Sequence, residues 1–481
     1  MSENLFFYSL EKNFEFEIAK NLLARKVNIN IISGEKNYFK NKKNIEFING
    51  KNFYDLEFLS DCMSKSNLND IKFLHQIKSK QWIFNLCLDR VSLIKLSANE
   101  IDSYYRNLVY YCYKILNEKK ISTIFFSRTP HFPWDIVIYY VSKYLNIKTL
   151  ILFRTEFDDK YIIKNCFEGN LESWVKVNNS DQTQIDIQSF LNKDSVYIKK
   201  SKIINNENDG IFYFLFRTLK LLIKVLIFNN YQSSSFMLKK PNRLTIAYKI
   251  IYRFIQNYYL QFIYNSFCSK EITVTSIVKL NKNFIYFPLH FQPERSTMPE
   301  GEIFTDQLLA IKILSSILPK NWLIIVKEHP RQFDKNCVDL RRINFRSAKF
   351  YKEIVLINNV RLCKLNQDSD KIINESKIIC TITGTSGFES LKKLKPVITF
   401  GNPWYSGCKS VTNIEEVIAK KNTLSTILNL KQSQLKKNLE NFIKLIENYL
   451  ISYYNPSLKF ISNKKKNIII NQFCKNLKNL I

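Results

Sequence analysis

The chain is poor in the residues that build metal sites and glycine-rich cofactor loops. It has nine Gly, four His and ten Cys in 481 residues, and no Cys-x-x-Cys pair, so neither a zinc site nor a disulfide framework is indicated. A reducing cytosol fits this cysteine usage best. No Walker-type glycine-lysine loop and no Gly-x-Gly-x-x-Gly are present, which argues against ATP hydrolysis and dinucleotide redox chemistry. The N-terminal residues have no basic region ahead of a long apolar core, so no secretory signal is expected.

Acidic residues are also scarce. Against 72 Lys and Arg there are 42 Asp and Glu, which gives a formal net charge of +30. A field of this sign favours polyanions, acidic membrane surfaces or anionic substrates. Hydrophobic residues make up 46% of the chain, enough for a globular protein, and the length predicts two domains of roughly 200 residues each.

Four of the nine glycines fall within residues 378–407. Residues 378–382 are expected to form a buried strand, Thr383, Gly384, Thr385 and Ser386 a turn that runs to residue 387, and the residues from about 388 a short helix. Such a turn leaves the first backbone N–H groups of a helix unpaired, and together with the hydroxyls they favour an anionic group such as a phosphate. The alternative is that the turn is glycine-rich for purely conformational reasons.

The N-terminal part predicts a parallel α/β sheet. Residues 5–8 and 27–32 are expected as strands around a helix, and residues 121–126 and 148–153 as strands around a helix over 136–145. The loop before this second helix holds His131 and Asp135, at the strand end where open α/β sheets bind ligands, so both are candidate site residues. In the alternative interpretation His131 is incidental in a proline-stiffened surface loop.

Residues 211–228 form a long apolar run that Arg217, Lys220 and Lys224 interrupt on one helical face. Three interpretations stay open: a basic amphipathic helix at a bilayer surface, a helix buried between domains with its cationic groups reaching out, and a membrane span. The following residues, to about 270, are aromatic and basic and are expected to be interdomain helix.

From residue 283 strands and helices alternate regularly, and polar loops follow the strands. One loop covers residues 290–297, the second contains Lys327, His329 and Pro330, and the third is the hydroxyl-rich turn at 383–386. In a doubly wound sheet such loops lie along one edge and can converge on one ligand. Lys327 and His329 can neutralise phosphate oxygens, and Glu389 could hold ribose hydroxyls, so a nucleotide fits this set.

The blocks FPLHFQPERST, DQ, VKEHP, TITGTSGFESL and KPVITFGNPWY, in this order, resemble the bacterial capsule polysaccharide synthesis family, which includes Kdo-transferring glycosyltransferases of GT-B architecture. A looser likeness extends to bacterial sialyltransferases and teichoic acid glycerophosphotransferases. The resemblance implies that His329, Pro330, Thr383, Gly384, Thr385 and Ser386 hold the nucleotide phosphate and that Glu389 contacts the ribose. Thr385-Ser386 stands where relatives have a Ser-Ser pair, which leaves the donor open.

The expected fold class is therefore α/β and GT-B-like, with two doubly wound Rossmann-type domains facing a cleft. Residues 1–205 would be the acceptor-side domain, 206–275 a basic helical interdomain segment, 276–420 the nucleotide-sugar domain, and 421–481 C-terminal helices with a basic tail. The expected function is transfer of a sugar from a nucleotide, of the CMP-linked Kdo or sialic-acid kind, to a lipid-linked glycan at the inner membrane surface. The partners would be that donor, that acceptor and the membrane, with no nucleic acid, in a cytoplasmic, membrane-peripheral protein.

Glu294 is the first candidate for the catalytic carboxylate and Asp135 the second, and the alternative for Glu294 is an ion pair with Arg295 or a nearby lysine. Asp368-Ser369-Asp370 spells a metal-binding Asp-x-Asp but precedes a short helix and is better explained as a cap, so no metal or other cofactor is expected. Two other functions stay open: transfer of a glycerol phosphate from a CDP-alcohol, and a non-enzymatic basic scaffold for membrane or nucleic acid.

Overall fold

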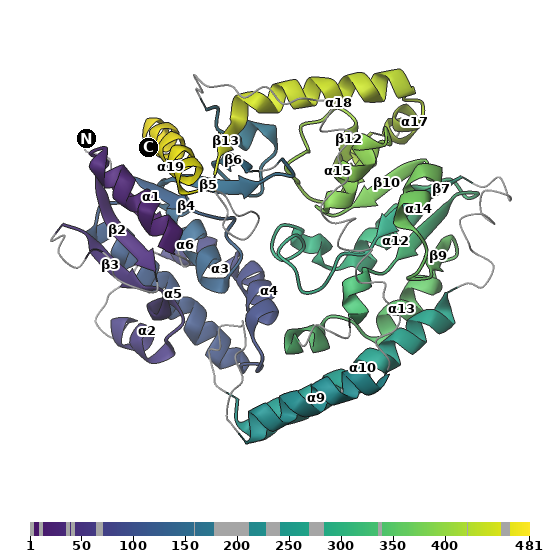
Figure 1. The fold of residues 1–481 in the computed structure, drawn as a ribbon, viewed down its shortest axis with the longest axis horizontal. Helices are drawn as coiled ribbons and strands as arrows, with labels where there is room; N and C mark the ends of the chain where they lie inside the picture. The colour runs from purple at the N-terminus through teal and green to yellow at the C-terminus, as the bar shows by residue number, and fades with distance from the viewer. Residues whose placement is uncertain are drawn as a thin grey trace. The chain divides into compact units, whose positions relative to one another are not determined.

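The computed structural model describes residues 4–8, 13–34, 39, 44–63, 71–157, 159–177, 211–227, 241–268, 283–334, 339–420, 422–453 and 462–481. The chain divides into two compact units. Unit 1 contains residues 1–89, 95–185 and 444–481, and unit 2 contains residues 90–94 and 186–443. Figure 1 shows that each unit is built around one β-sheet with helices packed on it.

Unit 1 has a seven-stranded sheet in the order β13-β6-β5-β4-β1-β2-β3. The five strands from β3 to β5 are parallel, whereas β6 and β13 are antiparallel additions at one edge. The strands are β1 (Leu5–Tyr8), β2 (Ile29–Gly34), β3 (Glu46–Asn49), β4 (Thr123–Phe126), β5 (Lys148–Arg154), β6 (Lys160–Lys164) and β13 (Leu450–Ser452). The order 3-2-1-4-5 of the parallel strands is that of a doubly wound Rossmann sheet, as predicted.

The helices of unit 1 cover this sheet and come from both ends of the chain. They are α1 (Asn13–Ala24), α2 (Leu56–Met63), α3 (Ile71–Lys78), α4 (Gln81–Val91), α5 (Ala98–Glu118), α6 (Pro133–Tyr144) and α19 (Asn463–Leu480). The apolar residues of α19, including Phe473 and Leu477, lie in one buried cluster with Ile18 and Leu22 of α1. The C-terminal segment therefore supplies part of the core of unit 1.

Unit 2 has a six-stranded, entirely parallel sheet in the order β12-β11-β10-β7-β8-β9. The strands are β7 (Phe284–Pro288), β8 (Leu323–Lys327), β9 (Val360–Cys363), β10 (Ile378–Thr381), β11 (Val397–Thr399) and β12 (Val411–Asn413). Counted from β7, this is again the Rossmann order 3-2-1-4-5-6, which confirms the predicted second doubly wound domain. The strand order reverses between β7 and β10.

The helices of unit 2 are α9 (Ile211–Leu226), α10 (Arg243–Phe267), α12 (Gln307–Ile317), α13 (Ala348–Val355), α14 (Ser369–Glu375), α15 (Thr385–Lys392), α16 (Ile414–Ala419), α17 (Thr423–Leu428) and most of α18 (Gln432–Ile446), whose last residues belong to unit 1. Short 3-10 helices include η3 (Glu302–Thr305), η4 (Pro330–Phe333) and η5 (Leu340–Asn344). Asp306 caps α12, because its carboxylate accepts from the backbone amides of Leu308 and Leu309. No helix in the part of the chain that the structure describes has the length and apolar character of a membrane span.

Two features differ from the expected division of the chain. Helices α9 and α10 belong to unit 2 instead of forming a separate interdomain segment, and residues 444–481 join unit 1. The pairing of β13 with β6, in which Leu450 lies opposite Ile162, draws the C-terminal segment into the first sheet.

Candidate functional site

The first contacts of the candidate site lie where the strand order of unit 2 reverses. His290 follows β7, and its Nε2 lies 3.0 Å from the hydroxyl of Thr381 and 3.2 Å from the backbone amide of Ile382, both at the end of β10. A Cβ on Gly384 would lie 2.9 Å from the His290 ring, so glycine is needed here for close approach. Two of the three predicted loops thus meet at the point where doubly wound sheets bind their ligands.

His290 is held as a neutral imidazole. Burial, aided by the nearby Arg346 guanidinium, lowers the pKa of His290 to about 4. Because Nε2 accepts from the Ile382 amide, the proton is on Nδ1, which lies 3.3 Å from the Ser296 hydroxyl. The Ser296 hydroxyl in turn donates to Glu294 at 3.1 Å. A hydrogen-bonded chain therefore runs from the switch point through His290 and Ser296 to the first candidate for the catalytic carboxylate.

Glu294 keeps an exposed surface, yet surrounding protein atoms still desolvate its carboxyl and raise the pKa of Glu294. The Ser296 hydrogen bond and the positive charges of Arg295 and Arg331 act in the opposite direction. Arg295 pairs with Glu300, at 3.0 Å between Nε and Oε1. The proposed ion pair of Glu294 with Arg295 is thus replaced by a hydrogen bond from Ser296. A carboxylate that is reachable by solvent and has a raised pKa has the properties of a general base.

His329 stands at the end of β8 and caps η4, because its Nδ1 accepts from the backbone amide of Arg331 at 3.2 Å. Pro330 occupies the first position of that short helix, where its missing N–H costs nothing. Burial and the neighbouring His290, Arg331, Arg342 and Arg346 lower the pKa of His329 to about 3. With Nδ1 accepting, the ring proton is on Nε2. His329 is therefore a neutral hydrogen-bond donor in this structure, and its contact with the donor phosphate stays a prediction.

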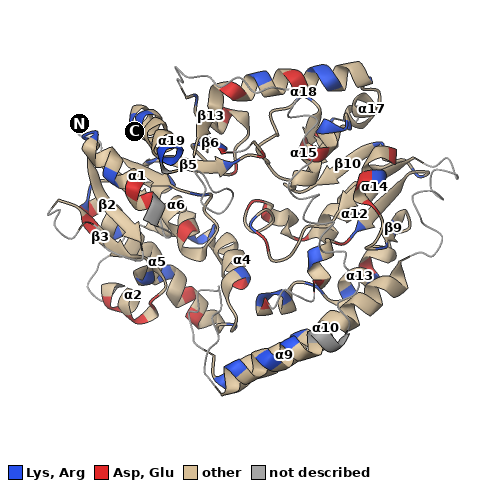
Figure 2. Cartoon of the chain, viewed as in Figure 1, with Lys and Arg blue, Asp and Glu red and all other residues tan. Residues whose placement is uncertain are grey.

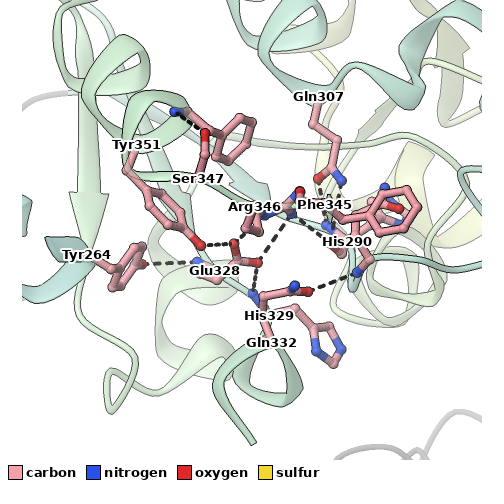
Figure 3. Close-up of polar contacts among 12 residues, drawn as sticks. Tyr264, His290, Gln307, Glu328, His329, Gln332, Phe345, Arg346, Ser347 and Tyr351 are labelled. Carbon is pink, nitrogen blue, oxygen red and sulfur yellow. Dashed lines mark hydrogen bonds and ion pairs between the residues drawn. The ribbon is translucent and has the colours of Figure 1, made fainter. Parts of the chain in front are cut away.

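The backbone at His329 is fixed by a buried ion pair that the sequence reasoning missed. Glu328 Oε2 accepts from Arg346 Nε and from the Tyr351 hydroxyl, each at 2.7 Å, and Oε1 accepts from the His329 amide, also at 2.7 Å. The Tyr264 hydroxyl accepts a hydrogen bond from the Glu328 backbone amide at 3.0 Å. Figure 3 shows the imidazole of His329 directed away from this pair. Glu328 and Arg346 therefore position the backbone of His329, while its imidazole takes no part in this ion pair.

The same arginine joins two loops of the site. Besides its bonds to Glu328, Arg346 donates from Nη2 to the backbone carbonyl of His290 at 3.0 Å. Gln332 Oε1 accepts from the backbone amide of Gln292 at 2.9 Å. Arg331 and Arg342 lie over the ring of Phe291, at 5.4 and 5.1 Å from its centroid. The sequence offered one signal for these cations, because Arg341, Arg342 and Arg346 gather shortly after the Lys-Glu-His-Pro block.

Lys327 lies apart from these arginines, and its role at the phosphate stays a prediction. Its ammonium donates to the Gln367 carbonyl at 2.5 Å and to the Ser369 hydroxyl at 3.0 Å. Side chains alternate along a strand, and Ile325 of β8 packs with Ile372 of α14, so Lys327 lies on the same face, toward the start of α14. Burial lowers the pKa of Lys327. Its role is to bind the loop that precedes α14.

Glu389 lies on α15 and is half-buried. Burial raises the pKa of Tyr286, and the negative charge of Glu389 adds to this effect. The Tyr286 hydroxyl lies 3.4 Å from the Ser369 hydroxyl, which also accepts a hydrogen bond from the Lys327 ammonium. The structure thus joins Tyr286, Ser369 and Lys327, and the contact of Glu389 with a ribose stays a prediction.

The hydroxyl-rich turn is shorter than predicted, because α15 begins at Thr385 and not near residue 388. Gly384 adopts an extended backbone as the N-cap, which places Thr385 and Ser386 in the first helical turn. Among the described residues, no hydrogen-bond acceptor is found for the backbone amides of Thr385 and Ser386. Thr383 donates from its hydroxyl to the Ser296 carbonyl at 2.5 Å, so this helix start is joined to the Glu294 loop. Unpaired amides at a helix start favour an anion.

In unit 1 the strand order reverses between β1 and β4, and the remaining two candidate site residues, His131 and Asp135, follow β4. Asp135 is 1% exposed and accepts from the Tyr8 hydroxyl at 2.7 Å and from the backbone amides of His131 and Phe132, each at 3.1 Å. Its carboxylate therefore caps α6, and an acceptor hydroxyl cannot reach it, which argues against a role as base. His131 is half-buried, and its Nδ1 donates to the Thr129 carbonyl at 2.7 Å. In the neutral ring this leaves Nε2 as the basic nitrogen.

Asp368 is a helix cap, as its position before α14 indicated. Its carboxylate accepts from the backbone amide of Asp370 at 2.9 Å, and the Asp370 carboxylate lies 2.5 Å from the ammonium of Lys393. Within the described ranges there is no group of three or more His, Cys, Asp or Glu side chains that could hold a metal ion. The Asp-x-Asp sequence therefore has a structural explanation.

Residues 244–443 match the family model described as capsule polysaccharide biosynthesis protein. No curated protein matches the chain. Among solved structures, the β-Kdo 2,7-transferase KpsC of Thermosulfurimonas dismutans is 11% identical with a TM-score of 0.31, and 99% of each chain is covered. A glycosyltransferase from Rickettsia africae is 12% identical with a TM-score of 0.26, over 99% of this chain and 97% of the other. Structural similarity at this level is too low to transfer a function.

Proposed function

We propose, from the premise that residues 244–443 belong to the capsule polysaccharide synthesis family of glycosyltransferases, that this enzyme moves a CMP-activated sugar of the Kdo or sialic-acid kind onto a lipid-linked glycan. The family itself was predicted from motifs within the same residues and is confirmed by the match. The acceptor places the reaction at the inner membrane surface, where capsule or related surface polysaccharide would be extended.

The observation that supports this proposal is the meeting of three polar loops at one switch point. His290 contacts Thr381 and Ile382, Thr383 binds the Ser296 carbonyl, and Arg346 links the His290 loop to Glu328, next to His329. A scaffold that bound polyanions would need basic and aromatic residues along a face and no such convergence. An open α/β sheet with donors at its switch point is suited to a nucleotide.

The donor phosphate would bind at the start of α15. The amides of Thr385 and Ser386 point out of the helix start, and His329 has a proton on Nε2 for a further hydrogen bond. As the sugar leaves, negative charge develops on the phosphate, and fixed donors of this kind stabilise it without reorganising. Arg331, which is exposed beside His329, would add positive charge. Protein groups can in this way assist the departing nucleotide.

Glu294 would take the proton from the acceptor hydroxyl. Its raised pKa brings the carboxylate closer to the pH of the cytosol, which makes it a better base than an ordinary surface glutamate. The Ser296 hydroxyl, itself held by His290, fixes the direction of the carboxylate. We expect Glu294→Gln to lower kcat by about 10²- to 10⁴-fold, in line with loss of a general base, with nucleotide binding unchanged.

The donor site is tested by thermal stabilisation of the purified protein with CMP, CDP, UDP and GDP. Selective stabilisation by CMP in the wild type, lost in His329→Ala and kept in His75→Ala, an exposed histidine of α3, supports a CMP-sugar donor site. A preference for CDP would point instead to transfer from a CDP-alcohol. Equal melting temperatures with and without every nucleotide would contradict the proposed function.

A further inference from the structure

The segment that contains α9 and α10 has an unusual charge distribution. From residue 211 to residue 268 the sequence contains eight Lys and Arg and no Asp or Glu. Figure 2 shows basic positions along α9 with no acidic position on it. Such a segment is repelled by basic surfaces and attracted to anionic ones.

Helix α9 presents three different flanks. One flank, with Leu221, Leu222 and Val225, packs in a cluster with Ile246 and Ile250 of α10. The next flank around the helix is apolar and exposed, and it consists of Leu215, Phe216, Leu219, Ile223, Leu226 and Ile227. The third flank carries Arg217, Lys220 and Lys224, next to the exposed apolar flank at 3.6 residues per turn. Among the described side chains of α9, those that join a core cluster of unit 2 thus lie on one flank.

Helix α10 has an exposed stripe of the same kind. Its members recur every three or four residues and are Leu244, Tyr248, Ile251, Tyr252, Ile255, Tyr259 and Phe262. Leu244 is 73% exposed and Phe262 is 70% exposed, so both ends of the stripe are open to solvent. At 1.5 Å per residue the stripe is about 27 Å long. A monomeric protein rarely exposes an apolar stripe of this length without a partner.

The two helices lie side by side near the end of α9. Arg243 of α10 donates to the Leu226 carbonyl at 3.3 Å, and Val225 packs with Ile246. Exposed apolar side chains beside lysines, without any carboxylate, are complementary to a bilayer surface with anionic headgroups, where apolar groups enter the acyl boundary and cations stay at the headgroups. A protein partner that buried these helices would need acidic groups to match the same lysines.

We infer that α9 and α10 together form a docking surface for a bilayer that contains anionic lipid. This inference rests on the proposed function in that it names the surface by which the enzyme meets its lipid-linked acceptor. It also combines two interpretations of the 211–228 segment, since one flank of α9 is packed on unit 2 and another is exposed.

The test is flotation of the full chain with vesicles of phosphatidylcholine alone or of phosphatidylcholine with phosphatidylglycerol. The variants are Phe216→Glu with Ile223→Glu on α9, and Ile255→Glu with Phe262→Glu on α10. The matched control is Leu356→Glu with Ile418→Glu, which changes two exposed apolar residues of unit 2 that are not part of these two helices. Stabilisation by CMP is measured on every protein, so that a failed donor site is distinguished from a failed docking surface.

The expected result is binding of the wild type and the control to phosphatidylglycerol vesicles, and a loss of about 100-fold or more in each pair of variants, with CMP stabilisation retained. Wild-type protein that binds neither vesicle, or variants that bind as well as the control, would overturn the inference. A wild-type dimer that becomes monomeric in the variants, without lipid binding, would overturn it too and assign the surface to a second copy of the chain.

Discussion

Replacement of Glu328 by glutamine tests whether the buried ion pair supports His329. The carboxylate of Glu328 accepts from Arg346, Tyr351 and the His329 amide, and it is 1% exposed. A carboxamide has only one oxygen, so its NH2 group must face at least one of these donors. The variant therefore loses the countercharge of Arg346 and at least one hydrogen bond, while the volume of the side chain is unchanged.

The expected destabilisation is large because Arg346 is also buried, with 6% of its surface exposed. Removal of one member of a buried ion pair costs about 3–5 kcal/mol, since the other charge is left without compensation. A domain is stable by only about 5–15 kcal/mol, so the loss is a substantial fraction of the total. The double variant Glu328→Gln with Arg346→Met removes both charges and should recover part of the lost stability.

The measurement is denaturant unfolding, with hydrogen exchange to locate the loss in unit 2. The control is Glu353→Gln, the same substitution in a half-buried glutamate of α13 that pairs with Lys312 and Lys349, where a change under about 1 kcal/mol is expected. At temperatures where Glu328→Gln is folded, stabilisation by CMP should be weaker, since the His329 amide loses its fixed acceptor. An effect of Glu328→Gln no larger than that of Glu353→Gln would refute the reasoning.

Three further predictions follow from the contacts of the site. In the unfolded chain the His290 imidazole binds a proton near pH 6.5, whereas in the folded state it stays neutral down to about pH 4. The free energy of unfolding should therefore fall by about 3 kcal/mol as the pH is lowered between these values. The unfolding of His290→Gln should lack this part of the pH dependence. Equal pH slopes would contradict it. Gly387→Ala should cost about 1–3 kcal/mol in thermal unfolding, because the new Cβ would lie 2.3 Å from the Tyr405 hydroxyl, and Tyr405→Phe should relieve part of the cost; an unchanged Tm argues against this contact. Asp135→Ala should cost about 3 kcal/mol, because the Tyr8 hydroxyl and two amides lose their acceptor, whereas kcat in the folded state should persist. A selective loss of kcat would restore Asp135 as a base.

The regular parts of both sheets could be predicted because each parallel strand is a short, buried apolar run followed by a helix. This pattern is plain at Leu5–Tyr8, Thr123–Phe126, Phe284–Pro288 and Ile378–Thr381. The missed strands are short or lie at edges, such as Leu450–Ser452, whose three residues have no pattern of their own. They form only because a distant strand offers unpaired backbone groups, and that information is not local.

The site was predictable to the level of its loops and not of its side chains. The ends of the predicted strands locate the loops that contain His329 and Thr383. Because doubly wound sheets bind ligands where the strand order reverses, these loops were expected to lie close together. The direction of Lys327 could have been inferred from alternation along the strand, because Ile324 and Val326 share one core cluster whereas Ile325 lies in another. The neutral state of His329 could not be inferred from the sequence, since it depends on burial and on Arg342 and Arg346, which come from another segment.

The return of the chain to its first sheet has a consequence for how the protein is made. During synthesis, β1 to β6 emerge from the ribosome well before β13 and α19, which supply the edge partner of β6 and the cluster around Phe473. Unit 1 is therefore begun first and completed only after all of unit 2 has been translated. Until then the α19 side chains of the cluster around Ile18 and Leu22 are missing, and the apolar surface left uncovered makes this nascent half prone to aggregation.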